Sequence, residues 1–259
     1  MPESRRPSYF PEQVVSVPAN LEKEEQFWSL DPELVLTEKS ANEMLRSYEL
    51  MEGLLQSGVL ERLGLNPNLS GFNSLKAHAT KVAILSLLIN DELRRQSSTV
   101  AANTRVFASA ALFHDLGKLD PKIHDVIMTP GIIRKDEKDA WDTIRQHPRI
   151  GHDVVHAMEE FSRAERLRVA EAIYKHHERK DGKGYYHVPF PNIPLESQII
   201  TVADTMDAIM AKRPYKEAGT TDLVMNELER CSGKQFNPDM PTAVINIRPS
   251  SGDFYRHAA

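Results

Sequence analysis

The chain has 259 residues, of which 41% are hydrophobic and 27% charged, values typical of a soluble globular protein with a substantial core. No apolar run approaches the roughly 20 residues of a membrane-spanning helix, and the first residues include no apolar signal segment. We therefore expect no membrane insertion and a cytoplasmic location. The net charge of -5 argues against a general binder of duplex nucleic acid, which would usually be basic.

Helical spacing of apolar residues dominates the chain, so the expected fold class is all-α. Residues 1–35 are expected to form an irregular arm with a short helix at 21–30. Thr37 and Ser40 offer N-cap chemistry for the first long helix, and Gly233 is a suitable end for the last one. Only residues 242–247, "TAVINI", have strand character. The expected helices cover residues 37–58, 74–95, 102–117, 135–158, 163–178, 195–212 and 220–233.

These elements suggest three parts. Residues 1–69 would form an arm and a helical segment of unknown role, residues 70–240 a helical bundle, and residues 241–259 a C-terminal tail. The amphipathic helix near residues 40–55 could pack on the bundle, form a homodimer or dock another protein.

Histidine and aspartate side chains lie on or at the ends of five predicted helices. Apolar residues flank each of them, which predicts that they point inward or lie at the mouth of the bundle. Burying an unpaired carboxylate costs several kcal/mol, but such groups can be buried together around cations, and helix bundles build metal sites in this way. The residues are His78, His114, Asp115, His147, His176, His177 and Asp204.

Imidazole and carboxylate ligands suit Fe, Mn, Zn or Ni, and with one cysteine beside ten histidines no thiolate cluster is expected. Seven ligands are too many for one ion that keeps a place for water, so two metals with a bridging carboxylate fit better. Each histidine alone is more often an ordinary core or surface residue; the joint pattern favours metal binding. We assign His124, His152, His156, His187 and His257 no metal role.

Four separated motifs, "HDLGK", "HPRIG", "HHERKDGKGYY" and "VADTMDAIMAKRPYK", resemble those of HD-GYP domains, within the HD superfamily of metal-dependent phosphohydrolases. The resemblance covers roughly residues 70–240. It implies an HD-type helical bundle with two or three metals, often iron or manganese, that hydrolyses cyclic di-GMP in signal transduction.

By position, the resemblance implies that the seven residues named above are the metal ligands and that Asp115 bridges the metals. Lys118, Arg213 and Lys216 match positions that contact substrate phosphates, and Gly184 and Tyr185 belong to the substrate loop. We expect a bridging hydroxide to attack phosphorus while Lys118 stabilises charge on the phosphate oxygens, so Asp115 and Lys118 are the expected catalytic residues.

Two departures from the family pattern bear on these expectations. The Gly-Tyr-Pro sequence is replaced by Gly184-Tyr185-Tyr186, which removes a proline that would stiffen the loop. Ser74 stands where members with a third metal tend to carry glutamate, which favours a dinuclear site. Two alternatives stay open: a phosphohydrolase acting on another cyclic or linear nucleotide, and a non-catalytic HD-type domain that binds a ligand or partner.

Overall fold

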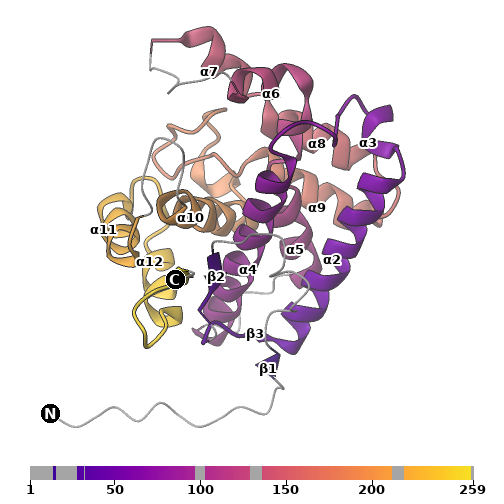
Figure 1. Cartoon of the computed structure of the whole chain (residues 1–259). Coiled ribbons are helices and arrows are strands. Elements are labelled where there is room, and N and C mark those ends of the chain that lie inside the picture. The colour runs from indigo at the N-terminus through magenta and orange to yellow at the C-terminus, as the bar shows by residue number, and fades with distance from the viewer. Residues whose placement is uncertain are drawn as a thin grey trace, which may run out of the picture.

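The computed structural model describes residues 14–15, 28–31, 33–96, 103–128, 136–211 and 219–257. Within these residues the chain is a bundle of helices with two small strand pairs (Figure 1), which confirms the all-α class. The helices are α2 (Glu38–Gln56), α3 (Val59–Arg62), α4 (Phe72–Gln96), α5 (Thr104–Phe113), α6 (Pro121–Met128), α7 (Lys138–Ile144), α8 (His147–Ala157), α9 (Arg163–Tyr174), α10 (Leu195–Met210), α11 (Thr221–Cys231) and α12 (Asp239–Ile247). Two 3-10 helices, η1 (Leu116–Leu119) and η2 (Phe190–Asn192), lie between them.

Helix α4 is the central element of the bundle, because it packs against α5, α10 and α12 (Figure 1). Residues Val82–Leu85 and Leu87–Ile89 on this helix are almost completely buried. Helix α2 packs against α5, and one hydrophobic cluster extends from Leu34 to Tyr255. The predicted division of the chain at residues 69 and 70 stays a prediction.

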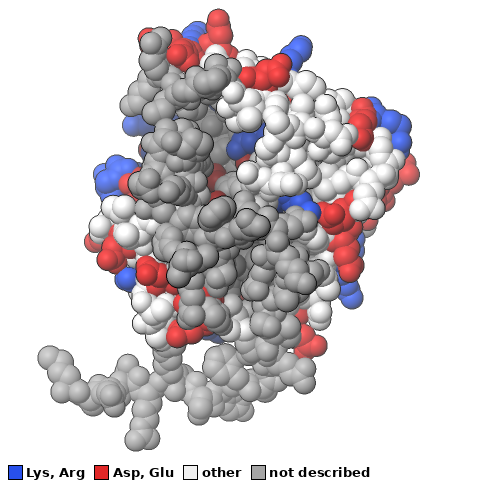
Figure 2. All heavy atoms as spheres, viewed as in Figure 1, with Lys and Arg blue, Asp and Glu red and all other residues white. Residues whose placement is uncertain are grey.

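None of the described helices is long and apolar enough to cross a membrane. Figure 2 shows acidic and basic side chains interspersed on the described part of one face.

The strands form two antiparallel pairs at the edge of the bundle. Strand β1 (Val14–Val15) pairs with β3 (Leu36–Thr37), and β2 (Trp28–Leu30) pairs with β4 (Tyr255–His257). The expectation of a helix at 21–30 is wrong for residues 28–30, because their backbone pairs with the C-terminal segment instead. The remainder of that helix lies outside the described residues.

The strand expected at residues 242–247 is also wrong, because these residues belong to α12. Met240, Ala243 and Val244 are buried at helical spacing, and the helix packs against α4 and α11. Strand propensity depends on cross-strand neighbours, and here no strand lies beside the segment within the described part of the chain.

The helix expected over 135–158 is interrupted between α7 and α8. Pro148 lacks a backbone N–H and cannot donate to the Ile144 carbonyl, so a continuous helix would lose this bond. The Ile144 carbonyl instead accepts a hydrogen bond from Nδ1 of His147 at 2.7 Å. The break therefore places His147 at the first position of a new helix.

The start of α2 is fixed as the sequence predicts, since Ser40 N–H donates to Thr37 Oγ1 at 3.2 Å. The buried carboxylate of Asp91 on α4 accepts from Ser40 Oγ at 2.8 Å and from Thr37 Oγ1 at 3.0 Å. Asp91 thus joins the beginning of α2 to the centre of the bundle.

We predict that Asp91→Ala lowers the free energy of unfolding by about 1–3 kcal/mol, because the buried Ser40 hydroxyl and the part-buried Thr37 hydroxyl lose their acceptor. Asp142→Ala on α7, whose side chain is 51% exposed, is the control and should change stability by less than about 0.5 kcal/mol. Denaturant unfolding of both variants measures the difference; equal stabilities would contradict the role of Asp91.

Candidate metal centre

Asp115 lies at the centre of the candidate site and is 2% exposed. Its Oδ1 lies 3.2 Å from Nε2 of His147 and 3.9 Å from Nε2 of His176. Its Oδ2 lies 3.5 Å from Nε2 of His78 and 3.4 Å from Nε2 of His114. The two carboxylate oxygens therefore face different histidines.

The potential ligands form two groups, and within each group the ligand atoms lie within 4.8 Å of one another. Each of the seven residues predicted as ligands belongs to one of the two groups. One group contains Asp115, His147, His176 and His177; the other contains His78, His114 and Asp204. Asp204 Oδ1 lies 3.3 Å from His78 Nε2, which places α10 beside α4 at the site.

Three of the histidines are oriented by the ends of helices. His114, His147 and His176 each follow the last residues of a helix, and each donates Nδ1–H to the carbonyl three residues earlier. Carbonyls in the last turn of a helix lack intrahelical donors, so they are available for this bond. The acceptors are Ala111 at 2.7 Å, Ile144 at 2.7 Å and Ile173 at 2.6 Å. Nε2 is therefore the nitrogen left to bind a metal in each ring.

His78 is oriented differently, by Asp207 on α10. Its Nδ1 lies 2.6 Å from Asp207 Oδ2, and this carboxylate is 2% exposed. A carboxylate oxygen accepts, so Nδ1 donates and Nε2 faces the site. Our sequence analysis missed Asp207; the available signal was a second aspartate three residues after Asp204, on the same face of an apolar helix.

Burial sets the protonation states of the histidines. It lowers the pKa of His177 to about 3, where His147 adds to the effect, and it also lowers the pKa values of His147 and His176. These three imidazoles are neutral at neutral pH, the form that binds metals. Burial also lowers the pKa of His78, but Asp115, Asp204 and Asp207 raise it well above its usual value.

Two buried atoms in this cluster have no hydrogen-bond partner: Oδ1 of Asp115 and Nε2 of His114. Leaving a buried carboxylate oxygen unpaired is costly, more so than for a neutral group. Both atoms point into the groups described above, and the donor set is entirely nitrogen and oxygen. The residues present therefore fit divalent cations.

Gly117 explains the glycine of "HDLGK". A Cβ atom at this position would lie 2.0 Å from the backbone oxygen of His147, so only glycine lets η1 approach α8 this closely. The contact brings the Asp115 turn against the first residue of α8.

The Gly184-Tyr185-Tyr186 loop is held by hydrogen bonds and ring stacking rather than by proline. The carboxylate of Glu178, 3% exposed, accepts from Tyr186 N–H at 2.7 Å and from Val188 N–H at 2.9 Å. The Tyr186 ring stacks on Tyr174 with centroids 4.4 Å apart, and its hydroxyl donates to the Arg145 carbonyl at 2.7 Å. Tyr186 thus joins the loop to the segment that precedes His147.

Tyr185 is the loop residue nearest to the metal groups. Its ring centroid lies 4.5 Å from that of His177 and 6.3 Å from that of His147. The guanidinium carbon of Arg145 lies over the Tyr185 ring, 5.7 Å from its centroid. Burial raises the pKa of Tyr185 to about 12, so the phenol stays protonated at neutral pH. Gly184 packs directly on Glu178, where a Cβ would lie 2.4 Å from the carboxylate.

Of the three predicted phosphate contacts, only Lys118 lies within the described residues. Its Nζ donates to Oδ2 of Asp115 at 2.5 Å, and its side chain is 27% exposed. Burial raises the pKa of Asp115, but Lys118 and His114 together lower it well below its usual value. Arg213 and Lys216 lie outside the described residues.

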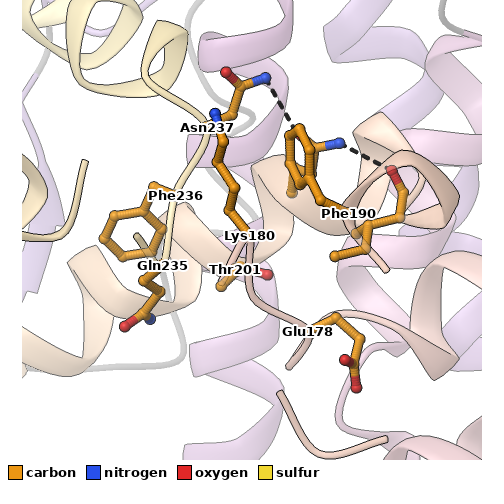
Figure 3. Close-up of a pocket in the computed structure, with 9 residues that line it drawn as sticks. Glu178, Lys180, Phe190, Thr201, Gln235, Phe236 and Asn237 are labelled. Carbon is orange, nitrogen blue, oxygen red and sulfur yellow. Dashed lines mark hydrogen bonds between the residues drawn. The ribbon is translucent and has the colours of Figure 1, made fainter. Parts of the chain in front are cut away.

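A small pocket is lined in part by Glu178 (Figure 3). Its lining includes Lys180, Phe190, Gln235 and Asn237, and none of the seven candidate ligands. In Figure 3 the carboxylate of Glu178 points away from the other labelled residues. Glu178 therefore both lines this pocket and holds the loop.

The histidines that we assigned no metal role lie outside both groups where their side chains are described. His124 contacts the Ser70 carbonyl, His187 contacts the Gly182 carbonyl, and His152 contacts Asp153. The ring of His156 stacks on that of His152.

A protein-family model described as "HD domain" matches residues 74–240. This chain belongs to the HD domain family. The match contains all seven candidate ligands, and the resemblance to HD-GYP proteins is confirmed by the relatives that follow.

Several curated relatives of this HD domain chain are named phosphodiesterases, which agrees with the enzyme class expected from the sequence. A cyclic di-GMP phosphodiesterase of Thermotoga maritima is 32% identical over 233 residues, covering 88% of this chain and 58% of the relative. The response regulator RpfG of Xanthomonas campestris, also named a cyclic di-GMP phosphodiesterase, is 37% identical over 147 residues, 56% of this chain and 36% of the relative. A 3'3'-cGAMP-specific phosphodiesterase of Vibrio cholerae is 30% identical over 176 residues, 66% of this chain and 35% of the relative.

The chain spans less than two thirds of the length of each of these relatives. Among solved structures, an HDG"Y"P protein from Bdellovibrio bacteriovorus matches with a TM-score of 0.51 and 14% identity, covering 80% of this chain and 69% of that chain. This structural likeness supports the helical fold alone.

We predict that Gly117→Ala weakens metal binding and lowers the unfolding temperature, because the added Cβ would displace the backbone of His147. Gly53→Ala is the matched control: Gly53 lies inside α2 with no atom within 4 Å of an added Cβ, so alanine should stabilise the helix by about 0.5–1 kcal/mol. Thermal unfolding and metal analysis of both variants measure the effect. A Gly117→Ala protein with normal metal content would contradict this account of the glycine.

Proposed function

We propose that this protein is a metal-dependent phosphodiesterase that hydrolyses a cyclic dinucleotide, foremost cyclic di-GMP. The observation that carries this proposal is the position of Asp115, whose two oxygens face two separate groups of potential ligands. Two neighbouring divalent ions with a shared carboxylate are a common basis of phosphoester hydrolysis. The names of the curated relatives support the substrate class.

In this proposal the protein holds two divalent ions, and Asp115 would be a ligand that they share. His147, His176 and His177 would hold one ion, and His78, His114 and Asp204 would hold the other. The proposed metals are iron or manganese, with zinc and nickel as the alternatives that imidazole and carboxylate ligands also accept.

Bound at these residues, two divalent ions would supply hydroxide from water at neutral pH and would neutralise phosphate charge. The chain's own residues position the substrate. Lys118 is the proposed contact to the phosphate that reacts, where its charge stabilises the oxygens, and Arg213 and Lys216 are proposed contacts to phosphate. Tyr185, half-buried beside His177, is proposed to offer a flat surface next to the reacting phosphate together with Gly184.

Another cyclic dinucleotide is the second candidate substrate. Relatives in Vibrio cholerae are named 3'3'-cGAMP-specific phosphodiesterases, and Tyr186 replaces the proline of the family loop. A non-catalytic domain that only binds its ligand is the third reading. Initial rates on cyclic di-GMP, 3'3'-cGAMP and linear pGpG, measured on protein with known metal content, separate these cases. Protein that holds two metals and cleaves none of the three would contradict the proposed activity.

We predict that Asp115→Ala abolishes both hydrolysis and the binding of at least one metal, because both groups of ligands lose their shared carboxylate. Asp125→Ala on α6, where the side chain is 84% exposed, is the control and should keep both properties. Metal analysis and the phosphodiesterase assay check the result. Full activity in Asp115→Ala would rule out the proposed site.

We predict that Glu178→Gln raises KM while the metal content stays normal, because the amide cannot accept both loop N–H groups. The expected loss in kcat/KM is about tenfold, equivalent to losing about 1.4 kcal/mol of loop anchoring. Glu171→Gln, a substitution on α9 at a side chain that is 44% exposed, is the matched control. An unchanged KM in Glu178→Gln would show that loop position does not affect substrate binding.

A further inference from the structure

A continuous chain of hydrogen bonds leads from the metal groups to the C-terminal segment. Nδ1 of His78 donates to Oδ2 of Asp207 at 2.6 Å, and the hydroxyl of Tyr255 donates to Oδ1 of the same carboxylate at 2.6 Å. Asp207 is 2% exposed and Tyr255 5%. Each oxygen of Asp207 therefore has a donor, and the two donors hold the carboxylate from opposite ends.

Tyr255 lies outside residues 74–240, the part of the chain matched by the HD domain model. It is the first residue of β4, and its backbone pairs with Leu30 of β2. The preceding residue, Phe254, is completely buried, and its carbonyl accepts from Asp31 N–H at 2.9 Å while its N–H donates to Thr221 at 3.2 Å. The β2–β4 pair thus fixes the backbone on which the Tyr255 side chain enters the bundle.

We propose that Tyr255 is a positioning residue for the metal centre, acting through Asp207 on the orientation of His78. This inference rests on the proposed function, since it assigns His78 as a metal ligand. The consequence is that the short β2–β4 strand pair contributes to metal binding. Segments flanking the family domain would then help to set the geometry of its active site.

The physical basis is the orientation of the His78 ring. The three histidines that use backbone carbonyls are held by the helices themselves, whereas His78 depends on a side chain that must itself be held. If the Tyr255 hydroxyl were removed, the buried Oδ1 of Asp207 would lose this donor. The Asp207 carboxylate could then rotate away from Nδ1 of His78. Removing such an outer partner of a metal ligand typically weakens metal binding about 10–100-fold.

Tyr255→Phe tests this inference, because it removes the hydroxyl and keeps the ring. We expect one of the two metals to bind about 10–100-fold more weakly, measured by competition with a chromophoric chelator, while the other is retained. KM should stay near the wild-type value while kcat falls, since the substrate contacts are unchanged. Tyr48→Phe on α2, where the ring packs beneath the ammonium of Lys76, is the matched control and should bind both metals normally.

Asp207→Asn and the double variant distinguish positioning from a general loss of stability. If Tyr255 acts through Asp207, adding Tyr255→Phe to Asp207→Asn has little further effect on metal affinity, whereas independent effects would multiply. Unchanged metal affinity in Tyr255→Phe, or multiplying effects in the double variant, would overturn the inference. Wild-type protein that binds metals but hydrolyses no phosphodiester would refute the proposed function and leave the metal result to decide this inference.

Discussion

The structure depends on the burial of one carboxylate, Asp115, among imidazoles. An ionised carboxylate in the interior is unfavourable unless cations or donors surround it. Lys118 supplies one donor, to Oδ2, yet Oδ1 has no hydrogen-bond partner. Helices α4, α5, α8, α9 and α10 meet at this point, so the packing of the bundle and the chemistry of the candidate site are fixed by the same contacts.

Backbone carbonyls at the ends of helices orient three of the candidate ligand histidines. A helix that ends leaves carbonyls without partners, and a histidine placed just beyond that end satisfies one of them through Nδ1. The same bond leaves Nε2 directed at the centre. His114 and His176 use this arrangement after α5 and α9, and Pro148 creates a further helix break that allows it at His147. The orientation of these three histidines thus follows from the positions at which the preceding helices end.

The Gly184-Tyr185-Tyr186 loop is held by contacts with other elements where the family pattern has a local backbone restriction. A proline would stiffen the loop by restricting its backbone, and this chain has Tyr186 instead. Its ring stacks on Tyr174 and its hydroxyl reaches the Arg145 carbonyl, while Glu178 holds the backbone. Three contacts to different elements replace one local restriction, so the loop now depends on the positions of α7 and α9.

The sequence alone determined the helical class and the types and order of the candidate metal ligands, because helical periodicity and His or Asp side chains among apolar residues are local signals. It did not determine that 242–247 form a helix, since Val244 and its neighbours suit either structure until α4 and α11 cover them. The sequence also did not determine the pairing of Asp207 with His78 or that of Tyr255 with Asp207. Tyr255 is 48 positions from Asp207 in the sequence, and Asp207 is 129 positions from His78. Only the packing of α4, α10 and β4 brings these distant residues within hydrogen-bond distance.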